Sequence, residues 1–357
     1  MKTEPLVSIL INNYNYDRFL TAAIDSALAQ TYFNIEVIVV DDGSTDKSRN
    51  IIAGYGDQII SVLKNNSGQA SSLNAGFNVC KGKIICFLDS DDLFHHEKVE
   101  KIVDLFAQNN LIDLPIALHN MFEPIDEKGL LMETNTIRNF LSEQDFEWRL
   151  LSKIIGSQFS FFDGEISKLC TNDQAIKFAH KYRYIPYIGM PTSSISVSRD
   201  MAEKVFPLPL DRNRILKGNA DHFLTKAASL IGMVYSTNLA LTQYRFHENG
   251  WHTKKVTQEA AELELKLKDD FLNLKLKEMD KEPVFSFFQS MQASGFYRCY
   301  FGYNSGDRLL KLAFDLMRWN PDFTHSSFFV RTFTQGFYYK LKAFYNDSLS
   351  QKNQLKS

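Results

Sequence analysis

The sequence predicts an α/β fold in which a mostly parallel sheet is flanked by helices. Short apolar runs, each long enough for one buried strand, alternate with amphipathic segments over residues 6–95. Two of these runs end in carboxylates, which would lie at the carboxyl ends of the strands, where parallel sheets place their binding sites. A chain of 357 residues that is 44% hydrophobic is long and apolar enough for one large or two ordinary domains.

The first part of the chain contains four expected strands and an early helix. The helix carries apolar residues at helical spacing from Phe19 to Leu28. The expected strands are Leu6–Ile11, Ile35–Val40, Ile59–Leu63 and Lys83–Leu88. Asp41 and Asp42 follow the second strand, and an acidic cluster follows the fourth.

The middle and the end of the chain are expected to differ from this pattern. Short β-like pieces, 115–122 and 130–133, flank an Asp-Glu-Lys-Gly turn, and a helix is expected from Asn219 to Leu230. From about residue 257 the composition becomes that of charged helices. We therefore expect a domain over 1–256, whose two halves meet at about residue 110, and a helical extension over 257–357.

Composition limits the partners and the location that we expect. A formal net charge of −2 gives no global attraction to nucleic acid. Four cysteines without a Cys-x-x-Cys pair favour reduced thiols, and the N-terminus is not typical of a signal peptide. We expect a cytoplasmic protein without a membrane span. The aromatic and basic segment 327–345 is either a helix packed on the catalytic part or a peripheral contact at the inner face of the membrane.

The acidic cluster after the fourth strand allows two interpretations. Asp89, Asp91 and Asp92 repel one another, so a divalent cation with a preference for oxygen ligands would stabilise them together. Alternatively, they form a solvated turn that caps a helix beginning near His95. The spacing alone does not separate a metal site from an acidic cap.

Several motifs together resemble the inverting family 2 glycosyltransferases, which have the GT-A fold. The resemblance is carried by motifs at residues 7–32, 35–48, 68–76 and 85–92, and more loosely by motifs at 219–228 and 244–250. In that order they read VSILINNYNYDRFLTAAIDSALAQTY, IEVIVVDDGSTDKS, GQASSLNAG, ICFLDSDD, NADHFLTKAA and YRFHENG. They occur in the order and spacing of the family. After about residue 250 the chain shows no such resemblance.

The resemblance implies a nucleotide-binding half to about residue 110, which binds the nucleotide sugar, and an acceptor half over 111–256. Tyr14 would stack on the base, and Asp42 would accept a hydrogen bond from it. Gln69 and Asn74 would line the ribose side, with Asp89 toward the ribose. The full set that the resemblance assigns to the donor is Asn13, Tyr14, Asn15, Asp42, Gly68, Gln69, Asn74, Asp89 and Ser90.

The resemblance also implies a metal and a catalytic base. Asp91, Asp92 and His247 would hold Mn²⁺ or Mg²⁺, which would stabilise the charge on the leaving diphosphate. Asp221 would be the base that takes the proton of the acceptor hydroxyl, with Glu248 the next candidate. The sequence departs from the family by carrying Asn219-Ala220 before Asp221, where a Glu-Asp pair is commoner, and Asn12 in place of a proline.

The expected function is therefore metal-dependent, inverting transfer of a sugar from a nucleotide diphosphate donor, preferably a UDP-sugar, to a hydroxyl group. The acceptor would be a glycan or a lipid-linked glycan, as in surface polysaccharide biosynthesis. One alternative is a GT-A scaffold that binds a nucleotide sugar or a partner without turnover. A haloacid-dehalogenase phosphatase also has Asp-x-Asp after a strand, but that motif lies near the first strand and is followed by Thr or Val. Here the motif ends the fourth expected strand and continues Asp-Leu-Phe, which argues against this class.

Overall fold

The computed structural model describes residues 4–132, 165–182, 185, 191–210, 220–248, 250 and 258–286. The chain divides into two compact units. The first consists of Met1–Lys181 and Ile185–Val284, and it contains all the elements described below apart from the last residue of one helix. The second consists of Tyr182–Tyr184 and Phe285–Ser357, almost all of it outside the described residues.

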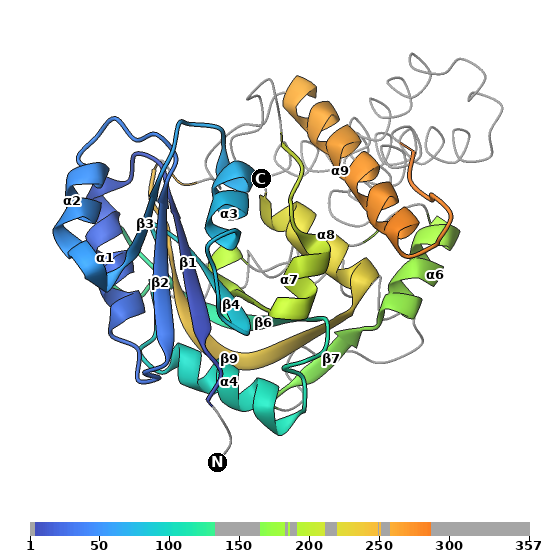
Figure 1. Ribbon diagram of the computed structural model, residues 1–357, viewed down its shortest axis with the longest axis horizontal. Coiled ribbons are helices and arrows are strands. Elements are labelled where there is room, and N and C mark those ends of the chain that lie inside the picture. Colours follow the sequence, from blue (N-terminus) through green and yellow to red (C-terminus); the bar gives the residue numbers. More distant parts are fainter. Residues whose placement is uncertain are drawn as a thin grey trace, which may run out of the picture. The chain divides into compact units, whose positions relative to one another are not determined.

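The N-terminal half of the sheet is parallel, as the sequence predicts. It contains β1 (Val7–Asn13), β2 (Ile35–Asp41), β3 (Ile60–Leu63) and β4 (Ile84–Asp89) in the order β3-β2-β1-β4 (Figure 1). All four expected strands are confirmed, with bounds shifted by one or two residues. The carboxyl ends of β1, β2 and β4 therefore lie side by side at one edge of the sheet.

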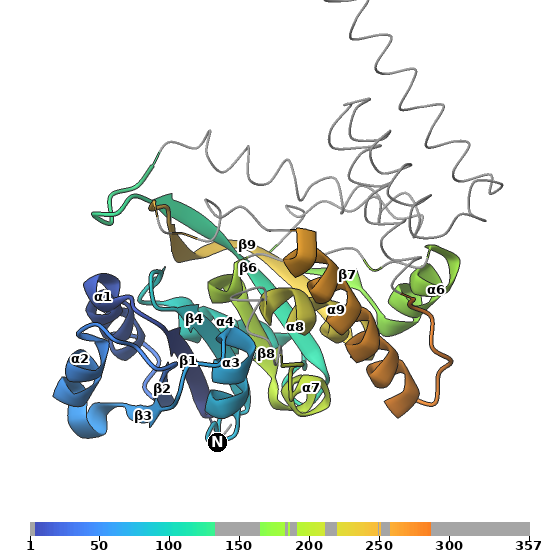
Figure 2. The ribbon, with the colours of Figure 1, turned by 90° about the horizontal axis from the view of Figure 1, so that it is seen from above.

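The other half of the sheet mixes parallel and antiparallel pairs. Beyond β4 the order continues β8-β6-β9-β5, and β7 also pairs with β9. These strands are β5 (Leu93–Phe94), β6 (Ile116–Ile125), β7 (Ser167–Cys170), β8 (Ile195–Ser198) and β9 (Met233–Arg245). β8 runs antiparallel to both β4 and β6, whereas β6 and β9 are parallel. Figure 2 shows β6 and β9 as long neighbouring ribbons.

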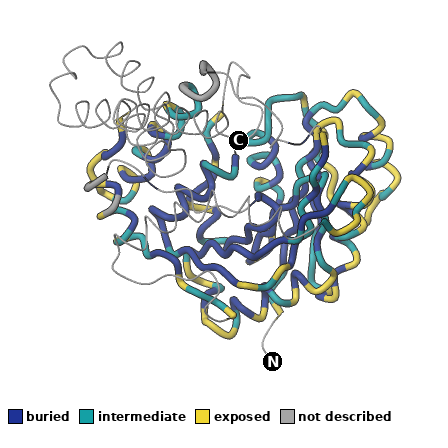
Figure 3. The backbone as a smooth tube through the Cα atoms, turned by 180° about the vertical axis from the view of Figure 1, so that it is seen from behind, coloured by how far each residue is buried: buried dark blue, intermediate teal, exposed yellow. Residues whose placement is uncertain are grey.

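The helices cover both faces of this sheet. They are α1 (Asp17–Leu28), α2 (Ser48–Tyr55), α3 (Gln69–Phe77), α4 (Lys98–Gln108), α6 (Asn172–Tyr182), α7 (Arg199–Val205), α8 (Ala220–Ile231) and α9 (Gln258–Glu278), with short 3-10 turns η1 (Gly56–Gln58) and η2 (Thr192–Ser194). The expected early helix and the expected helix after residue 219 are both confirmed. Figure 3 shows buried strands at the centre and exposed residues concentrated in the surrounding loops and outer helices.

Residues of β1 are buried on both faces, which explains why its residues up to Ile11 are apolar except for Ser8. Val7, Ile9 and Ile11 belong to the core that includes the buried residues of α1 and α4. Leu10 points to the opposite face, where α3 approaches so closely that a Cβ atom on Gly76 would lie 2.1 Å from Leu10 Cδ1. Glycine at this position therefore lets α3 pack directly on β1.

The structure bears on some of the expectations for the chain after residue 110 and not on others. The Asp-Glu-Lys-Gly turn is present, with a hydrogen bond from Gly129 N to Asp126 O, and Leu131 forms a single bridge with Ile125. Helix α9 lies within the first compact unit, which extends past residue 256 to Val284. The segment 327–345 lies outside the described residues. Among the residues described, no helix is both long and apolar enough to cross a membrane.

Candidate active site

Polar residues from three parallel strands meet where the sequence predicts a site. Asn12 in β1 pairs with Asp89 in β4, and Asn13 pairs with Asp41 in β2. Because parallel strands place their carboxyl ends at one edge, residues far apart in the sequence become neighbours there.

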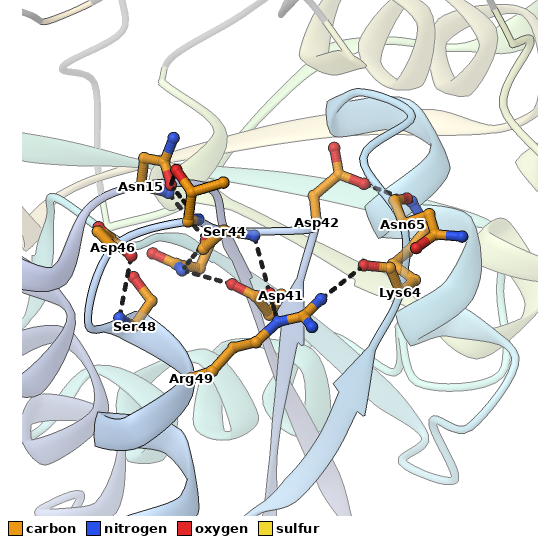
Figure 4. Close-up of polar contacts among 11 residues, drawn as sticks. Asn15, Asp41, Asp42, Ser44, Asp46, Ser48, Arg49, Lys64 and Asn65 are labelled. Atoms are coloured by element: carbon orange, nitrogen blue, oxygen red, sulfur yellow. Dashed lines mark hydrogen bonds and ion pairs between the residues drawn. The ribbon is translucent and has the colours of Figure 1, made fainter.

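Asp41 has a structural role at this edge. It is fully buried, and its carboxylate accepts hydrogen bonds from Arg49 Nε (2.8 Å), Ser44 N (3.0 Å) and Asn13 Nδ2 (3.1 Å) (Figure 4). Burial by itself would raise the pKa of Asp41, but the hydrogen bonds from Ser44, Arg49 and Asn13 together lower it. Asn13, which the sequence assigns to the donor, thus uses its amide nitrogen to tie β1 to β2.

Asp42 is held by the loop that precedes α3. Its Oδ1 accepts hydrogen bonds from Ser67 N (2.9 Å) and from Lys64 Nζ, and its Oδ2 accepts one from Gly68 N (2.7 Å). Figure 4 shows that Lys64 is also bonded to Arg49, whose Nη2 donates to the Lys64 carbonyl oxygen (3.0 Å). Gly68 has φ +88°, a conformation that favours glycine and turns its N–H toward Asp42. Asp42 therefore orders the loop of which Gly68 and Gln69 are part.

The loop after β1 leaves one aromatic ring exposed. Asn15 has φ +57°, its N–H donates to Ser44 Oγ (2.9 Å), and its Oδ1 accepts from Thr45 N (2.8 Å). These bonds fix the loop against the start of the β2–α2 connection. Tyr14 is 45% exposed, so part of its side chain is accessible to a ligand.

Gln69 and Asn74, both on α3, have different surroundings. Asn74 pairs with the backbone of Leu208, donating to its carbonyl (2.9 Å) and accepting from its N–H (2.7 Å). Gln69 Nε2 donates to Asp89 Oδ1 (3.1 Å), while its Oε1 accepts from Ala220 N (3.2 Å). Asn74 thus anchors a backbone segment, whereas Gln69 lies between the acidic cluster and the first turn of α8.

Asp89 lies among other carboxylates. Burial, together with the neighbouring charges of Asp91 and Asp221, raises the pKa of Asp89 to about 7, against the effect of hydrogen bonds from Asn12 and Thr192. Ser90, the next residue, is buried. The first turn of α8 therefore brings Asp221 close to the acids that follow β4. This juxtaposition joins two motifs that are more than a hundred residues apart.

Asp92 has protein partners for both of its carboxylate oxygens. Oδ1 accepts from Arg245 N (2.8 Å), and Oδ2 accepts from Ser193 Oγ (2.6 Å). The side chain is 1% exposed, and burial and the charges of Asp91 and Asp89 raise its pKa well above the ordinary range. The alternative interpretation, in which these acids cap the next helix, is wrong. Helix α4 begins at Lys98, its N-cap residue is Glu97, and no side chain makes a capping hydrogen bond.

Asp91 contacts the histidine that the sequence also assigns to the metal. His247 Nε2 lies 3.0 Å from Asp91 Oδ2, and Arg18 Nη2 lies 3.1 Å from His247 Nδ1. A guanidinium can only donate, so Nδ1 accepts and Nε2 carries the proton that it donates to Asp91. The edge of Tyr16 also packs against His247, with ring centroids 5.6 Å apart.

The donor atoms of Asp91 and His247 suit a divalent cation that is shared with a ligand. In the part of the chain that the structure describes, no group of three or more His, Cys, Asp or Glu side chains could hold a metal by itself. A cation at this pair would need further oxygens from a ligand or from water, as Mg²⁺ at phosphate sites usually does.

Arg245 and Lys98, which the sequence did not single out, stabilise the turn formed by residues 89–92. Arg245 Nε donates to Asp91 O (2.7 Å), and its Nη1 donates to Asp126 O (3.0 Å). Lys98 is fully buried, and its Nζ donates to Ser193 O and to Thr242 Oγ1 (2.9 Å). Burial lowers the pKa of Lys98 to about 7. No local pattern identifies these residues, because their partners lie far away in the sequence.

Asp221 occupies the first turn of α8, as predicted. Its Oδ1 accepts a hydrogen bond from His222 N (3.0 Å). His222 Nδ1 lies 2.8 Å from Glu264 Oε1 on α9, and Phe223 packs edge-on against Phe271 of α9 with centroids 6.1 Å apart. Helix α9 therefore holds the helix that carries Asp221.

This combination of a parallel nucleotide-type half-sheet, a mixed second half and an acidic turn after β4 defines an α/β transferase of the GT-A type. A family model described as glycosyl transferase family 2 matches residues 8–166. An uncharacterized glycosyltransferase of Rickettsia prowazekii, RP339, is 32% identical over 262 residues, which cover 72% of this chain and 74% of that protein. The chain belongs to glycosyl transferase family 2.

Other relatives extend this comparison. The uncharacterized glycosyltransferase alr2836 of a Nostoc species is 29% identical over 245 residues, which cover 68% of this chain, and the chain spans 65% of that relative's length. A protein of Escherichia coli, UDP-Glc:alpha-D-GlcNAc-diphosphoundecaprenol beta-1,3-glucosyltransferase WfgD, is 28% identical over 52% of this chain and 69% of its own.

A solved structure agrees with the fold. The crystal structure of S. aureus TarS 1-349 in complex with UDP matches with a TM-score of 0.54 at 14% identity, and the match covers 94% of this chain and 92% of that chain. At this level of identity the likeness concerns the fold alone. It confirms the GT-A arrangement that the motifs predict.

Proposed function

We propose that this protein transfers a sugar, with inversion, from a UDP-sugar to a hydroxyl group of a glycan or lipid-linked glycan, and that transfer requires Mn²⁺ or Mg²⁺. The observation that carries the proposal is the convergence of Asp89, Asp91 and Asp221 at the edge where β1, β2 and β4 end. Sugar transfer needs one carboxylate to hold the cation at the donor diphosphate and another to deprotonate the acceptor hydroxyl. Both must lie at the same place.

The nucleotide would lie over the loops after β1 and β2. Tyr14 offers an exposed ring for stacking, and Asp42 anchors the loop through which Gly68 and Gln69 reach the site. The ring face and the carboxylate acceptor suit a base such as uracil, which has a π-face and one ring N–H donor. WfgD, whose name specifies UDP-glucose as its donor, supports the same choice of nucleotide.

Asp91 and His247 would hold the cation, and Asp92 would position the turn. Asp92 has both oxygens engaged by Ser193 and Arg245, so we assign it to the support of Asp91. When bound, a divalent cation stabilises the negative charge that builds on the leaving diphosphate. For His247 to join as a ligand, its Nε2 must first release the proton that it now donates to Asp91.

Asp221 would act as the general base. It lies in the first turn of a helix that α9 holds in place, close to the acids of β4 and separate from them in sequence. A carboxylate so placed can take the proton of the attacking hydroxyl as that oxygen approaches the anomeric carbon. Asn15, Asn74 and Asn13 would contribute by shaping the surrounding loops, given their protein partners.

The alternative functions make different predictions for one assay. The purified full chain is incubated with a panel of UDP-, dTDP- and GDP-sugars, and release of the free nucleotide diphosphate is followed with EDTA, Mg²⁺ or Mn²⁺. The proposal predicts release from one donor class that depends on the cation. Release that persists in EDTA would contradict metal dependence. Binding of a donor without any release, with every acceptor extract tried, would favour a scaffold that does not turn over.

A further inference from the structure

The donor that we propose brings more negative charge to the site than one cation can balance. Asp89, Asp91 and Asp221 already place acidic groups there, and a nucleoside diphosphate sugar adds two negative charges. One divalent cation supplies two positive charges. Unless part of this repulsion is relieved by a basic side chain, the diphosphate would be held in a site of net negative charge.

Most basic side chains of the site that the structure describes are committed to other partners. Lys64 Nζ contacts Asp42, and Arg49 Nε contacts Asp41. Arg245 is 4% exposed and donates to backbone carbonyls, and Lys98 is fully buried beneath the acidic turn. These groups balance carboxylates or fill backbone acceptors, so they are not free to move onto a ligand.

Arg18, near the start of α1, differs from them. Its side chain is 41% exposed, and its guanidinium lies against the ring of Phe19, 4.3 Å from the centroid. Nη2 lies 3.1 Å from His247 Nδ1, which fixes the group beside the Asp91–His247 pair. The Nε and Nη1 groups make no hydrogen bond with the residues that the structure describes.

The other contact of Arg18 is with an acid that a ligand could displace. Glu127 Oε1, in the turn between β6 and residue 131, lies 3.7 Å from Arg18 Nη2, and the Glu127 side chain is 45% exposed. An exposed ion pair at this distance contributes little to stability. A diphosphate, with several oxygens suited to the planar donors of arginine, would be the stronger partner.

We propose that Arg18 binds the diphosphate of the nucleotide sugar directly, exchanging Glu127 for a phosphate oxygen while His247 keeps the guanidinium in place. This inference rests on the proposed function, because it takes a nucleoside diphosphate as the ligand. It assigns a binding role to a residue of α1, outside the acidic turn and outside the loop after β1.

The test compares ligands with and without the diphosphate. UDP and uridine are titrated into the full-length protein in Mn²⁺ for wild type, Arg18→Ala, Arg18→Lys and Arg18→Gln. Loss of charge-assisted hydrogen bonds should lower UDP affinity about 10- to 100-fold in the Ala and Gln variants, with partial retention in the Lys variant. Uridine affinity should not change. Lys204→Ala, which removes an exposed positive charge from α7, is the control for general electrostatics and should bind UDP normally.

Glu127→Gln separates phosphate binding from a structural role. If Arg18 only anchors the turn that carries Glu127, Glu127→Gln will weaken UDP binding as much as Arg18→Ala does, and the proposal is overturned. Our proposal expects unchanged or tighter UDP binding, because a competitor for the guanidinium is removed. Mn²⁺ titration without nucleotide is the second check. An equal loss of Mn²⁺ affinity in Arg18→Gln would show that Arg18 acts through the metal ligands instead.

Different results would reject the role of Arg18 and the proposed donor. If wild type binds UDP in Mn²⁺ and Arg18→Ala binds it equally well, only the role of Arg18 is rejected. If wild type binds no nucleoside diphosphate at all, the proposed donor is wrong, and the role of Arg18 falls with it.

Discussion

Gln69 donates a hydrogen bond to Asp89 Oδ1 at 3.1 Å, and the same side chain accepts one from the backbone of α8 at Ala220 (3.2 Å). One amide thus connects Asp89, which we assign to the donor, with the helix turn that carries Asp221. If Asp89 moves when the donor binds, the two hydrogen bonds of Gln69 would transmit the movement to that turn. Gln69 is therefore placed to align the two halves of the proposed reaction.

Gln69→Ala should lower turnover more than it lowers stability. If misalignment of the turn removes about 1.4 kcal/mol of transition-state stabilisation, on the order of one hydrogen bond, the rate falls about 10-fold. Donor hydrolysis and thermal unfolding, measured on the same preparation, test this. The matched control is Asn74→Gln, which disturbs the Leu208 contact and leaves the Asp89–Ala220 bridge intact. A melting-temperature loss that accounts for the whole rate loss would contradict the alignment role.

Asp42→Asn should weaken donor binding without changing the requirement for metal. The amide keeps the shape of the carboxylate but can no longer accept with both oxygens from Ser67, Gly68 and Lys64. Asp42→Ala should in addition lower stability by about 1–3 kcal/mol, because two backbone N–H groups lose their partner in a nearly buried position. Calorimetric titration of UDP and urea unfolding measure the two effects. Equal UDP affinity in Asp42→Asn would reject contact between Asp42 and the base.

Asp91→Ala should abolish metal-dependent donor binding while the fold is preserved. Asp91 contributes one of the two described protein groups that we assign to the cation, and its partner His247 alone is a poor site for a hard metal. Asp92→Ala, which removes the acceptors of Ser193 Oγ and Arg245 N beside it, should instead reduce stability. Titration of UDP in Mn²⁺ distinguishes them. Wild-type affinity in Asp91→Ala would remove Asp91 from the metal site.

The metal-free protein should lose stability as the pH rises from about 4 to 7. The pKa of Asp89 is raised from its ordinary value of 3.8 to about 7, so in this interval the folded protein keeps a proton that the unfolded chain has released. The free energy of unfolding therefore falls with increasing pH. Asp89→Asn should remove that part of the slope and be more stable than wild type above pH 7 in EDTA. Urea unfolding across this pH range checks the sign, and an unchanged slope would contradict it.

The sequence predicts the strands of the N-terminal half of the sheet well because their signal is local. Runs such as 35–40 are mostly apolar, and each ends within two residues of the end of its strand. The roles within the acidic cluster depend on distant partners instead. Asp91 and Asp92 are adjacent and chemically identical, yet Asp92 is bound by Ser193 and Arg245, which lie 101 and 153 residues further along the chain. No spacing rule could separate them.

The same distinction holds for Asn74 and Arg18. The motif around Asn74 places it on the correct helix, but its bonds to Leu208 span 134 residues. Arg18 lies within the best-matched stretch of sequence, and only the fold brings it within reach of His247, 229 residues away. Side-chain function at this site is therefore set by long-range packing of β9, η2 and α8 against the parallel half-sheet.

The most direct test of the account is turnover of Asp221→Asn measured together with its donor affinity. The asparagine keeps the shape of the side chain and its acceptor for His222 N but cannot take a proton. We predict that UDP affinity in Mn²⁺ stays at the wild-type value while donor turnover falls about 10²- to 10⁴-fold. Near-normal turnover in Asp221→Asn would contradict the account, and Glu248 would then be the next candidate for the base.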